Sequence, residues 1–444
     1  MSRDCHRRWN DHRLWVRLAA VSAFCLPFRA AAASETYAIH GQFTYVEQDT
    51  SDFDSPYQGT NSLSPGKGAE TIDATLYLGA RPWNNAELWI NPELDQGHGL
   101  DDTLGAAGFP SGEAYKVGRN QPYFRLQRVF LRQSLNLGAD RVPVEAAANQ
   151  LGGESSENRV VIWLGKFSVT DVFDTNRYAH DPRADFLNWT AIDTGTFDYA
   201  ADAWGYSAGG AVEWYQGSWA LRAGLFDLSN VPNSPHLDPG FHEYQGVAEL
   251  EHRHRVGELD GRMLLTLFDS RGRMGLLDTA LTQAQLAQTI PDIAAVREYR
   301  SRLGAGIGFE QALSRNVGLF GRIGKAAGNV EAYEFTDVDR SWSVGTRVAG
   351  EGWRRSNDSA GLAVVVNNAS AARQRYLAAG GLGILVGDGR LPRPAAEQIL
   401  ETYYSAALLK QLQVSFDYQW IDHPAYNAER GPVSVIAIRL HGQF

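Results

Sequence analysis

Ser434-Val-Ile-Ala-Ile-Arg-Leu-His-Gly-Gln-Phe444 closes the chain. Its even-numbered positions carry the large apolar side chains, and its odd-numbered positions include Arg439 and His441. Side chains alternate between the two faces of a β-strand, so this segment is a strand with one apolar face. Behind a secretion signal, a closing strand with a terminal Phe is typical of bacterial outer-membrane barrels. We therefore expect Phe444 to be recognised by the barrel-assembly machinery.

The amino terminus has the three parts of a secretion signal. A basic region is followed by an apolar run over 18–28, and Ala31-Ala-Ala33 provides a small-residue cleavage site. The apolar run is shorter than the roughly 20 residues that span a bilayer. The sequence predicts a cleaved signal peptide over 1–33 and one mature domain over 34–444.

Composition excludes several classes of protein. Both cysteines, Cys5 and Cys25, lie in the predicted signal, so the mature chain has no disulfide and no thiol nucleophile. Cleavage would remove six arginines and two aspartates, which moves the formal net charge from -10 to -14 and argues against a nucleic-acid partner. A mean hydropathy of -0.31 is far too low for a bundle of membrane helices.

The same alternation of apolar and polar residues recurs along the chain, as in Leu412, Val414 and Phe416 against Gln413 and Ser415. An even number of such strands is typical of an outer-membrane barrel. We predict an all-β transmembrane antiparallel barrel of about sixteen strands, whose first and last strands pair because an open edge is not viable in lipid. The predicted strands lie near 37–45, 71–78, 85–94, 125–137, 159–168, 203–215, 218–228, 242–254, 260–270, 301–311, 315–325, 340–349, 360–368, 398–409, 411–421 and 432–444.

Charged side chains on these strands indicate which face is the lumen. A cation facing the bilayer midplane costs about 2–4 kcal/mol, so charged positions should point inward. This rule places both signs of charge in the lumen and predicts a wet pathway rather than a packed core. The inward residues are Glu87, Glu93, Arg128, Arg132, Arg222, Glu249, Glu251, Arg262, Glu310, Arg322, Arg347 and Arg439.

Two connections are longer than a strand-to-strand link requires. Residues 95–124 and 168–202 are dense in Gly, Pro, aromatic and charged residues, which predicts loops that fold inward and narrow the barrel. A third stretch, 276–299, has apolar residues at helical spacing and favours a helical turn outside the cell.

Several runs in the chain resemble the carbohydrate-selective porin family, OprB. They occur in order from about residue 90 to 391 and include Asn91-Pro-Glu-Leu-Asp-Gln-Gly97, Asp198-Tyr-Ala-Ala-Asp-Ala-Trp-Gly-Tyr206 and Gly165-Lys-Phe-Ser-Val-Thr-Asp-Val-Phe-Asp-Thr-Asn-Arg-Tyr-Ala-His-Asp-Pro-Arg183. The resemblance implies a sixteen-stranded, monomeric outer-membrane pore, surrounded by lipid and lipopolysaccharide, through which small sugars of the glucose type diffuse. It implies no cofactor and no metal.

The resemblance also implies a narrow, charged eyelet. Charged groups would bond sugar hydroxyls and an aromatic ring would contact the apolar face of the sugar, with weak binding so that the sugar is released. Each candidate could instead brace the barrel wall or pin a loop to it. Inward parity and position in the two loops select Glu93, Asp95, Arg128, Arg132, Lys166, Asp174, Arg177, Arg183 and Arg222, with Trp189 or Trp204 as aromatic partners. The parity of Trp204 with Tyr206 points it toward lipid unless the strand begins later.

Two other functions stay open at this point. A porin for small organic anions or aromatic acids would need a lumen dominated by cations. An outer-membrane hydrolase would need a nucleophile with a base in register, whereas Ser434 and His441 share no face. His252 and His254 share a strand face but have no clear third metal ligand.

Overall fold

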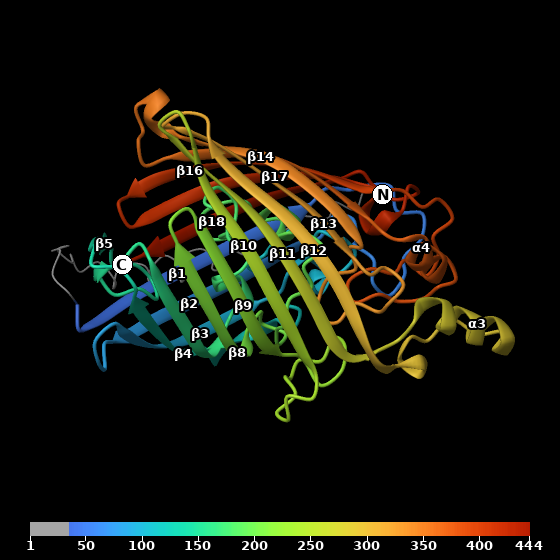
Figure 1. Cartoon of the computed structure of the whole chain (residues 1–444). Coiled ribbons are helices and arrows are strands. Elements are labelled where there is room, and N and C mark those ends of the chain that lie inside the picture. Colours follow the sequence, from blue (N-terminus) through green and yellow to red (C-terminus); the bar gives the residue numbers. More distant parts are fainter. Residues whose placement is uncertain (1–34) are drawn as a thin grey trace, which may run out of the picture.

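Sixteen antiparallel strands close into one barrel in the computed structural model, which describes residues 35–444 (Figure 1). The predicted all-β barrel and its strand number are confirmed. Neighbouring strands follow chain order round the wall, and a separate small hairpin of β5 (Val142–Val144) and β6 (Gly153–Ser155) is inserted between the fourth and fifth wall strands. The predicted signal peptide, 1–33, lies outside the described residues.

The strands are 9 to 18 residues long, enough to cross a bilayer at a tilt. The first half of the wall is formed by β1 (Tyr37–Thr50), β2 (Gly68–Ala80), β3 (Ala86–Gly97), β4 (Arg119–Asn136), β7 (Arg159–Phe167), β8 (Ser207–Gln216), β9 (Trp219–Asp227) and β10 (Tyr244–Val256). The second half is formed by β11 (Leu259–Met274), β12 (Glu298–Ala312), β13 (Val317–Ala326), β14 (Arg340–Ala349), β15 (Ser359–Asn368), β16 (Glu397–Leu409), β17 (Leu412–Asp422) and β18 (Val433–Gln443).

The barrel closes between its first and last strands. β1 pairs with β18 from Gln42 opposite Gln443 to Thr50 opposite Val435. Gly41 and Phe444 then exchange backbone hydrogen bonds of 3.0 and 2.9 Å. Pairing thus closes the barrel along residues 41–50 of β1, as strands in lipid require.

Alternation along the strands separates two surfaces. Outward positions carry exposed apolar side chains, such as Leu164, Leu303 and Ile323, which are 62–64% exposed. Inward positions carry buried charged side chains, including Arg322 and Arg439. Among residues 35–444, no helix is long and apolar enough to cross a membrane.

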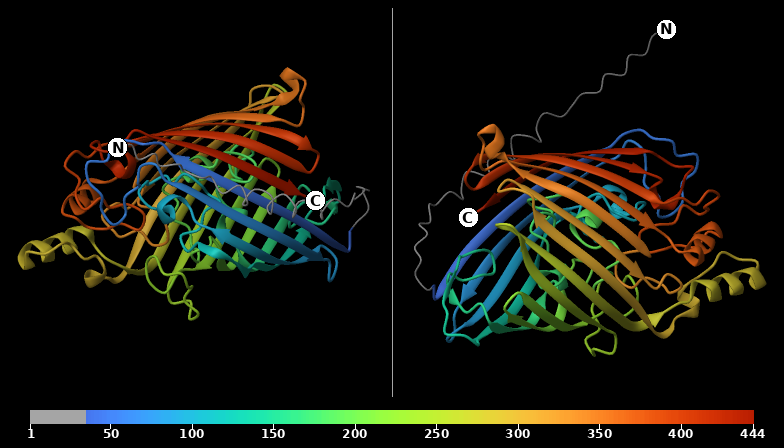
Figure 2. Two further views of the ribbon diagram at one scale, coloured as in Figure 1. Left: turned by 180° about the vertical axis from the view of Figure 1, so that it is seen from behind. Right: turned by 45° about the horizontal axis from the view of Figure 1, so that its top comes forward.

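The two ends of the barrel differ in their connections. Three links at one end are two-residue turns, at 217–218, 257–258 and 410–411, and Gly217 and Gly257 adopt positive φ there. Links at the other end are long and carry α3 (Leu277–Ala287) and α4 (Ala371–Ala378), far from the carboxy terminus (Figure 2). Short turns face the periplasm in such barrels and long loops face outward. The helix expected within 276–299 is present.

Both long predicted loops enter the barrel, with bounds that differ from those predicted. The first spans 98–118 and the second, which contains α2 (Trp189–Ile192), spans 168–206. The prediction of strand from 125 was wrong because the polar residues Arg119–Gln121 continue the pairing of β4 with the end of β3. The prediction of strand from 203 was wrong because β8 begins at Ser207.

The interior is more closely packed than a wet pathway would be. Phe167 lies against Trp163 and Phe226 at ring distances of 5.5 Å each. Phe173, from the second inserted segment, lies edge-on to Phe226 at 6.0 Å. The segments therefore bring their own aromatic core into the barrel, and this part of the lumen expectation is corrected.

Candidate functional site

A cavity of about 340 Å³ lies between the two inserted segments and the wall formed by β2 and β4. Small-molecule sites commonly enclose about 300–1,000 Å³. The cavity is lined by three cations, five carboxylates, a histidine and several aromatic side chains. These are Lys116, Arg128, Arg183, Glu113, Asp171, Asp181, Asp193, Asp202, His180, Tyr77, Phe109, Tyr115, Trp189, Tyr199, Trp204, Tyr206 and Phe335.

Arg183 joins the second inserted segment to the wall of β2. Its Nη2 lies 2.8 Å from Asp73 Oδ1, its Nε lies 3.2 Å from Glu113 Oε2, and its Nη1 donates to the hydroxyl of Tyr77 at 3.3 Å. Burial alone would lower the pKa of Arg183, but the surrounding carboxylates raise it well above its ordinary value. Arg183 is thus a fixed positive charge at the cavity.

Glu93 and Asp95 lie behind Arg183 rather than on the cavity surface. Glu93 is 1% exposed and accepts hydrogen bonds from Tyr115 and Gln127, each at 3.0 Å. Asp95 is also 1% exposed. Both carboxylates therefore act on the cavity through their charge and through the side chains that they hold.

Arg128 forms a two-point ion pair with Asp171 on the cavity surface. Its Nε and Nη2 donate to the two carboxylate oxygens of Asp171 at 2.8 and 2.7 Å. The guanidinium also lies over the ring of Tyr206, 4.8 Å from its centre. A two-point arginine–carboxylate pair fixes both side chains in one geometry.

Trp204 lies in the second inserted segment and is 6% exposed. Its ring packs under Arg125, 3.3 Å from the guanidinium carbon, and its Nε1 donates to the hydroxyl of Tyr123 at 3.0 Å. Asp202 joins Arg125 and Lys166, at 3.3 and 2.8 Å. Trp204 meets the exception stated for its parity, because the strand begins later, at Ser207.

Four polar atoms on the cavity lining have no aligned hydrogen-bond partner among the described residues. They are Thr103 Oγ1, His180 Nδ1, Trp189 Nε1 and Asp193 Oδ1. The ring of Trp189 is fixed between Phe109, stacked at 5.4 Å, and Phe335, edge-on at 5.0 Å. An unbonded buried polar group costs about 1–3 kcal/mol, so this lining favours a ligand that both donates and accepts.

His180 and Asp193 lie close enough to influence each other, with Nδ1 and Oδ1 3.4 Å apart. Burial lowers the pKa of His180, but the neighbouring carboxylate of Asp193 outweighs burial and raises that pKa above its ordinary value. Thr103, His180 and Asp193 were missed from the sequence, because nothing in their local pattern shows that they face a cavity.

The remaining sequence candidates lie away from the cavity. Asp174 is buried and accepts from the backbone and hydroxyl of Thr194, which stabilises the bend of the second segment. Lys166 is not part of the cavity lining, but it pairs with Asp202, which is. Arg132 pairs with Glu87 on the wall. Whether any of them contacts sugar stays a prediction.

Arg177 and Arg222 lie nearer the periplasmic end. Arg177 lines a second, wider hollow of about 900 Å³ that is bounded by the short turns. Arg222 is 4% exposed and bonds Glu213, Glu249 and Glu251 at 2.9, 2.8 and 2.8 Å. All donor groups of Arg222 are thus engaged within the wall.

Carboxylates from β16 hold both inserted segments against the far wall. Glu397 accepts from the backbone N–H groups of Ala107 and Gly108 at 2.9 and 2.7 Å. Glu401 accepts from those of Leu187 and Asn188, the latter at 3.1 Å. The inserted segments are therefore fixed to the wall at β16 as well as at β2 and β4.

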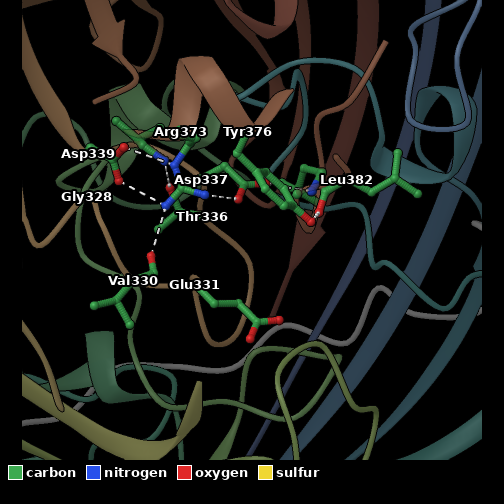
Figure 3. A network of polar contacts seen from close by, with 12 residues as sticks. Gly328, Val330, Glu331, Thr336, Asp337, Asp339, Arg373, Tyr376 and Leu382 are labelled. Carbon is green, nitrogen blue, oxygen red and sulfur yellow. Dashed lines mark hydrogen bonds and ion pairs between the residues drawn. The ribbon is translucent and has the colours of Figure 1, made fainter. Parts of the chain in front are cut away.

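A polar network outside the barrel ties α4 to the segment 327–339 (Figure 3). Arg373 of α4 donates to Asp337 Oδ1 at 2.8 Å and to Asp339 Oδ2 at 2.9 Å. Burial opposes ionisation of Asp339, but the charge and hydrogen bonds of Arg373 hold its pKa below the usual range. These contacts thus hold the connection that carries α4 and the segment 327–339 together.

Among residues 35–444, no group of three or more His, Cys, Asp or Glu side chains is arranged to hold a metal ion. His252 and His254 lie side by side, with ring centres 6.0 Å apart, and Trp219 packs against His252.

Comparison with known proteins shows which family and which solved structures this chain resembles. A family model described as carbohydrate-selective porin, OprB family, matches residues 60–444. No curated protein matches the chain by sequence. The high-pH structure of Pseudomonas putida OprB is similar with a TM-score of 0.68 and 14% identity, over 92% of this chain and 94% of that chain. The outer membrane channel DcaP of Acinetobacter baumannii reaches a TM-score of 0.50 at 9% identity, over 94% and 99%.

Proposed function

This chain belongs to the carbohydrate-selective porin family, OprB, and we propose that the cavity between its inserted segments is the eyelet at which sugars are selected. Family and fold are those of an outer-membrane sugar porin, a channel rather than an enzyme. The proposal concerns the place and the chemistry of selection.

The unbonded polar atoms of the lining carry this proposal. Thr103 Oγ1 can donate and accept, and Trp189 Nε1 donates. A sugar hydroxyl can donate and accept at once, so a neutral sugar satisfies both groups without bringing a charge into the site. The aromatic rings around them supply apolar surface for the C–H faces of the sugar.

The charges of the lining favour a neutral solute over an anion. Five carboxylates face three cations, and Arg128 and Arg183 are already paired with Asp171, Asp73 and Glu113. A pore for organic anions or aromatic acids would require unpaired cations at this level. Mono- and small oligosaccharides are therefore the proposed solutes.

Passage requires binding that is favourable but weak, since a solute held tightly would not leave. The fixed ion pairs serve this requirement by leaving only a few groups for the solute. Below the eyelet, the hollow lined by Arg177 widens to about 900 Å³, so the solute would leave into a broader aqueous space.

Single-channel conductance of the refolded protein in a planar bilayer tests the function. Glucose and then maltose are titrated against a small organic anion at the same ionic strength. We expect a small conductance that falls saturably with sugar and is unchanged by the anion. Block by the anion alone would contradict sugar selection and favour the anion-porin alternative.

A further inference from the structure

Two cations face outward at the extracellular rim of the barrel wall. Lys325 near the end of β13 lies directly opposite Arg340, the first residue of β14, in the last registered pair before the segment 327–339. Both side chains are exposed. Within residues 35–444, neither side chain has a hydrogen bond or an ion pair, in contrast to the arginines of the lumen.

This pair is unfavourable as it stands. Like charges directly opposite each other on neighbouring strands destabilise a sheet. The next outward pair toward the membrane centre is Ile323 with Trp342, which are 64% and 42% exposed. Tryptophan is enriched at the interface between lipid and water, so Lys325 and Arg340 lie at the level of lipid headgroups.

An apolar groove of about 780 Å³ begins beside Lys325 and crosses β10 to β13. Gly246, Ala248 and Ala305 form its low points, between the larger side chains of Leu267 and Leu303. A Cβ built on Gly246 would meet nothing within 4 Å, so the groove is open there.

Strand register connects the groove to the cations. Ala248 is opposite Leu267, Leu267 is opposite Ala305, and Ala305 is opposite Lys325. Ala248 lies well inside β10, whereas Arg340 opens β14 at the rim. This row of residues therefore runs from the apolar band of the wall to the extracellular rim, where Lys325 and Arg340 lie.

One carboxylate also borders the groove. Asp269 Oδ2 lies 3.3 Å from Ser301 Oγ, and Arg271 donates to that same hydroxyl at 3.1 Å. Asp269 and Arg271 thus share the hydroxyl of Ser301 as a hydrogen-bond partner. Lys325 and Arg340 have no such partner among residues 35–444, so both can bind an anionic group.

We propose that this outer groove binds a phosphorylated glycolipid of the outer leaflet, with an acyl chain along Ala248 and Ala305 and a phosphate between Lys325 and Arg340. A phosphate accepts charge-assisted hydrogen bonds from both cations and removes their mutual repulsion. An apolar groove that ends in two cations matches a molecule with an acyl chain and an anionic headgroup. Asn368, opposite Arg340 on β15, adds an amide donor beside the phosphate.

Native mass spectrometry of the refolded barrel in detergent, titrated with bisphosphorylated lipid A, tests this site. We expect one lipid per barrel at low concentration, and binding about tenfold or more weaker in Lys325→Gln/Arg340→Gln. The matched control is Arg315→Gln/Lys410→Gln, which removes two exposed cations from the short turns at the opposite end. Heat-modified gel migration confirms that every variant is folded.

Three further arms separate the parts of the proposal. Ala305→Phe fills the groove and should weaken lipid A binding while both cations remain. Lipid A without its phosphates should bind the native barrel weakly. Its affinity should be no higher than that of intact lipid A for the Lys325→Gln/Arg340→Gln variant. Inorganic phosphate alone should show no saturable binding. Equal affinity of both charge variants for lipid A, or equal affinity of the native barrel for the dephosphorylated lipid, would overturn the site.

Discussion

Arg128 and Arg132 face the lumen from the same strand, but only Arg128 lines the cavity. We expect Arg128→Ala to raise single-channel conductance and weaken sugar block, because a bulky cation leaves the cavity lining and Asp171 loses its two-point partner. Arg132→Ala, the matched control, removes an equivalent wall pair with Glu87. Similar changes in both variants would contradict the placement of the eyelet.

Trp189 offers a more conservative test of sugar binding. Trp189→Phe removes the unbonded Nε1–H but keeps an aromatic ring between Phe109 and Phe335. One lost hydrogen bond should weaken sugar block about fivefold and leave the open conductance nearly unchanged. Trp83→Phe, at an exposed turn, is the control. An unaltered blocking constant would remove Trp189 from the eyelet.

Residue-level prediction from the sequence succeeded where strand parity applied. Arg128 and Arg222 were both selected because a cation on a strand could not face lipid. Arg128 lines the cavity, whereas Arg222 lies in a cluster of ion pairs within the wall. Parity gives the face of a side chain but not its height in the barrel. Thr103 and Asp193 lie on inserted segments without a repeating pattern, so only their three-dimensional placement shows that they line the cavity.

At the scale of elements, Arg222 joins β9 to both neighbouring strands through three carboxylates. Arg222→Ala should lower the free energy of unfolding by about 3–5 kcal/mol, because it leaves buried Glu213 and Glu249 without a counter-charge. Denaturant unfolding in detergent measures this change. The exposed pair of Arg255 with Asp260 is the control, since Arg255→Ala should cost no more than about 1 kcal/mol. Equal costs would contradict a structural role for the Arg222 cluster.

Glu401 tests the attachment of the second inserted segment. Glu401→Ala removes the acceptor for the N–H groups of Leu187 and Asn188, so the segment should move and the open current should become larger and noisier. Glu258→Ala in an exposed periplasmic turn is the control. A quiet current of unchanged size would show that the other anchors are sufficient.

Most elements could be predicted from alternation, because a strand with one face in lipid and one in the lumen repeats every second residue. The bounds of β4 and β8 could not. Arg119–Gln121 is polar on both faces where β4 rises beyond the membrane, and Trp204 and Tyr206 mimic the alternation of the strand that follows them.

At the scale of the whole molecule, the outer segments meet at Glu334. Burial raises the pKa of Glu334 to about 8, although Lys116 acts in the opposite direction. Between about pH 4.5 and 8 the folded protein keeps this proton while the unfolded chain releases it, so stability should fall as pH rises through that window. Glu334→Gln should flatten this part of the plot of melting temperature against pH, and Glu351→Gln should not. An identical slope in both variants would contradict the assignment.

The closed sixteen-stranded wall could be predicted because lipid forbids an open edge. The packed interior could not, since the same inward charges suit water-filled and segment-filled barrels alike. Glu397 and Glu401 bond the backbone of the inserted segments, and backbone groups carry no sequence signal.

Those two glutamates also bear on how the protein is made. They lie on β16, near the carboxy terminus, whereas the segments that they anchor follow β3 and β7. A chain inserting from its amino terminus would carry both segments for half its length before their anchors arrived. In such a chain, sealing the wall and narrowing the passage would occur together late in assembly, and a barrel stalled before that point would leak.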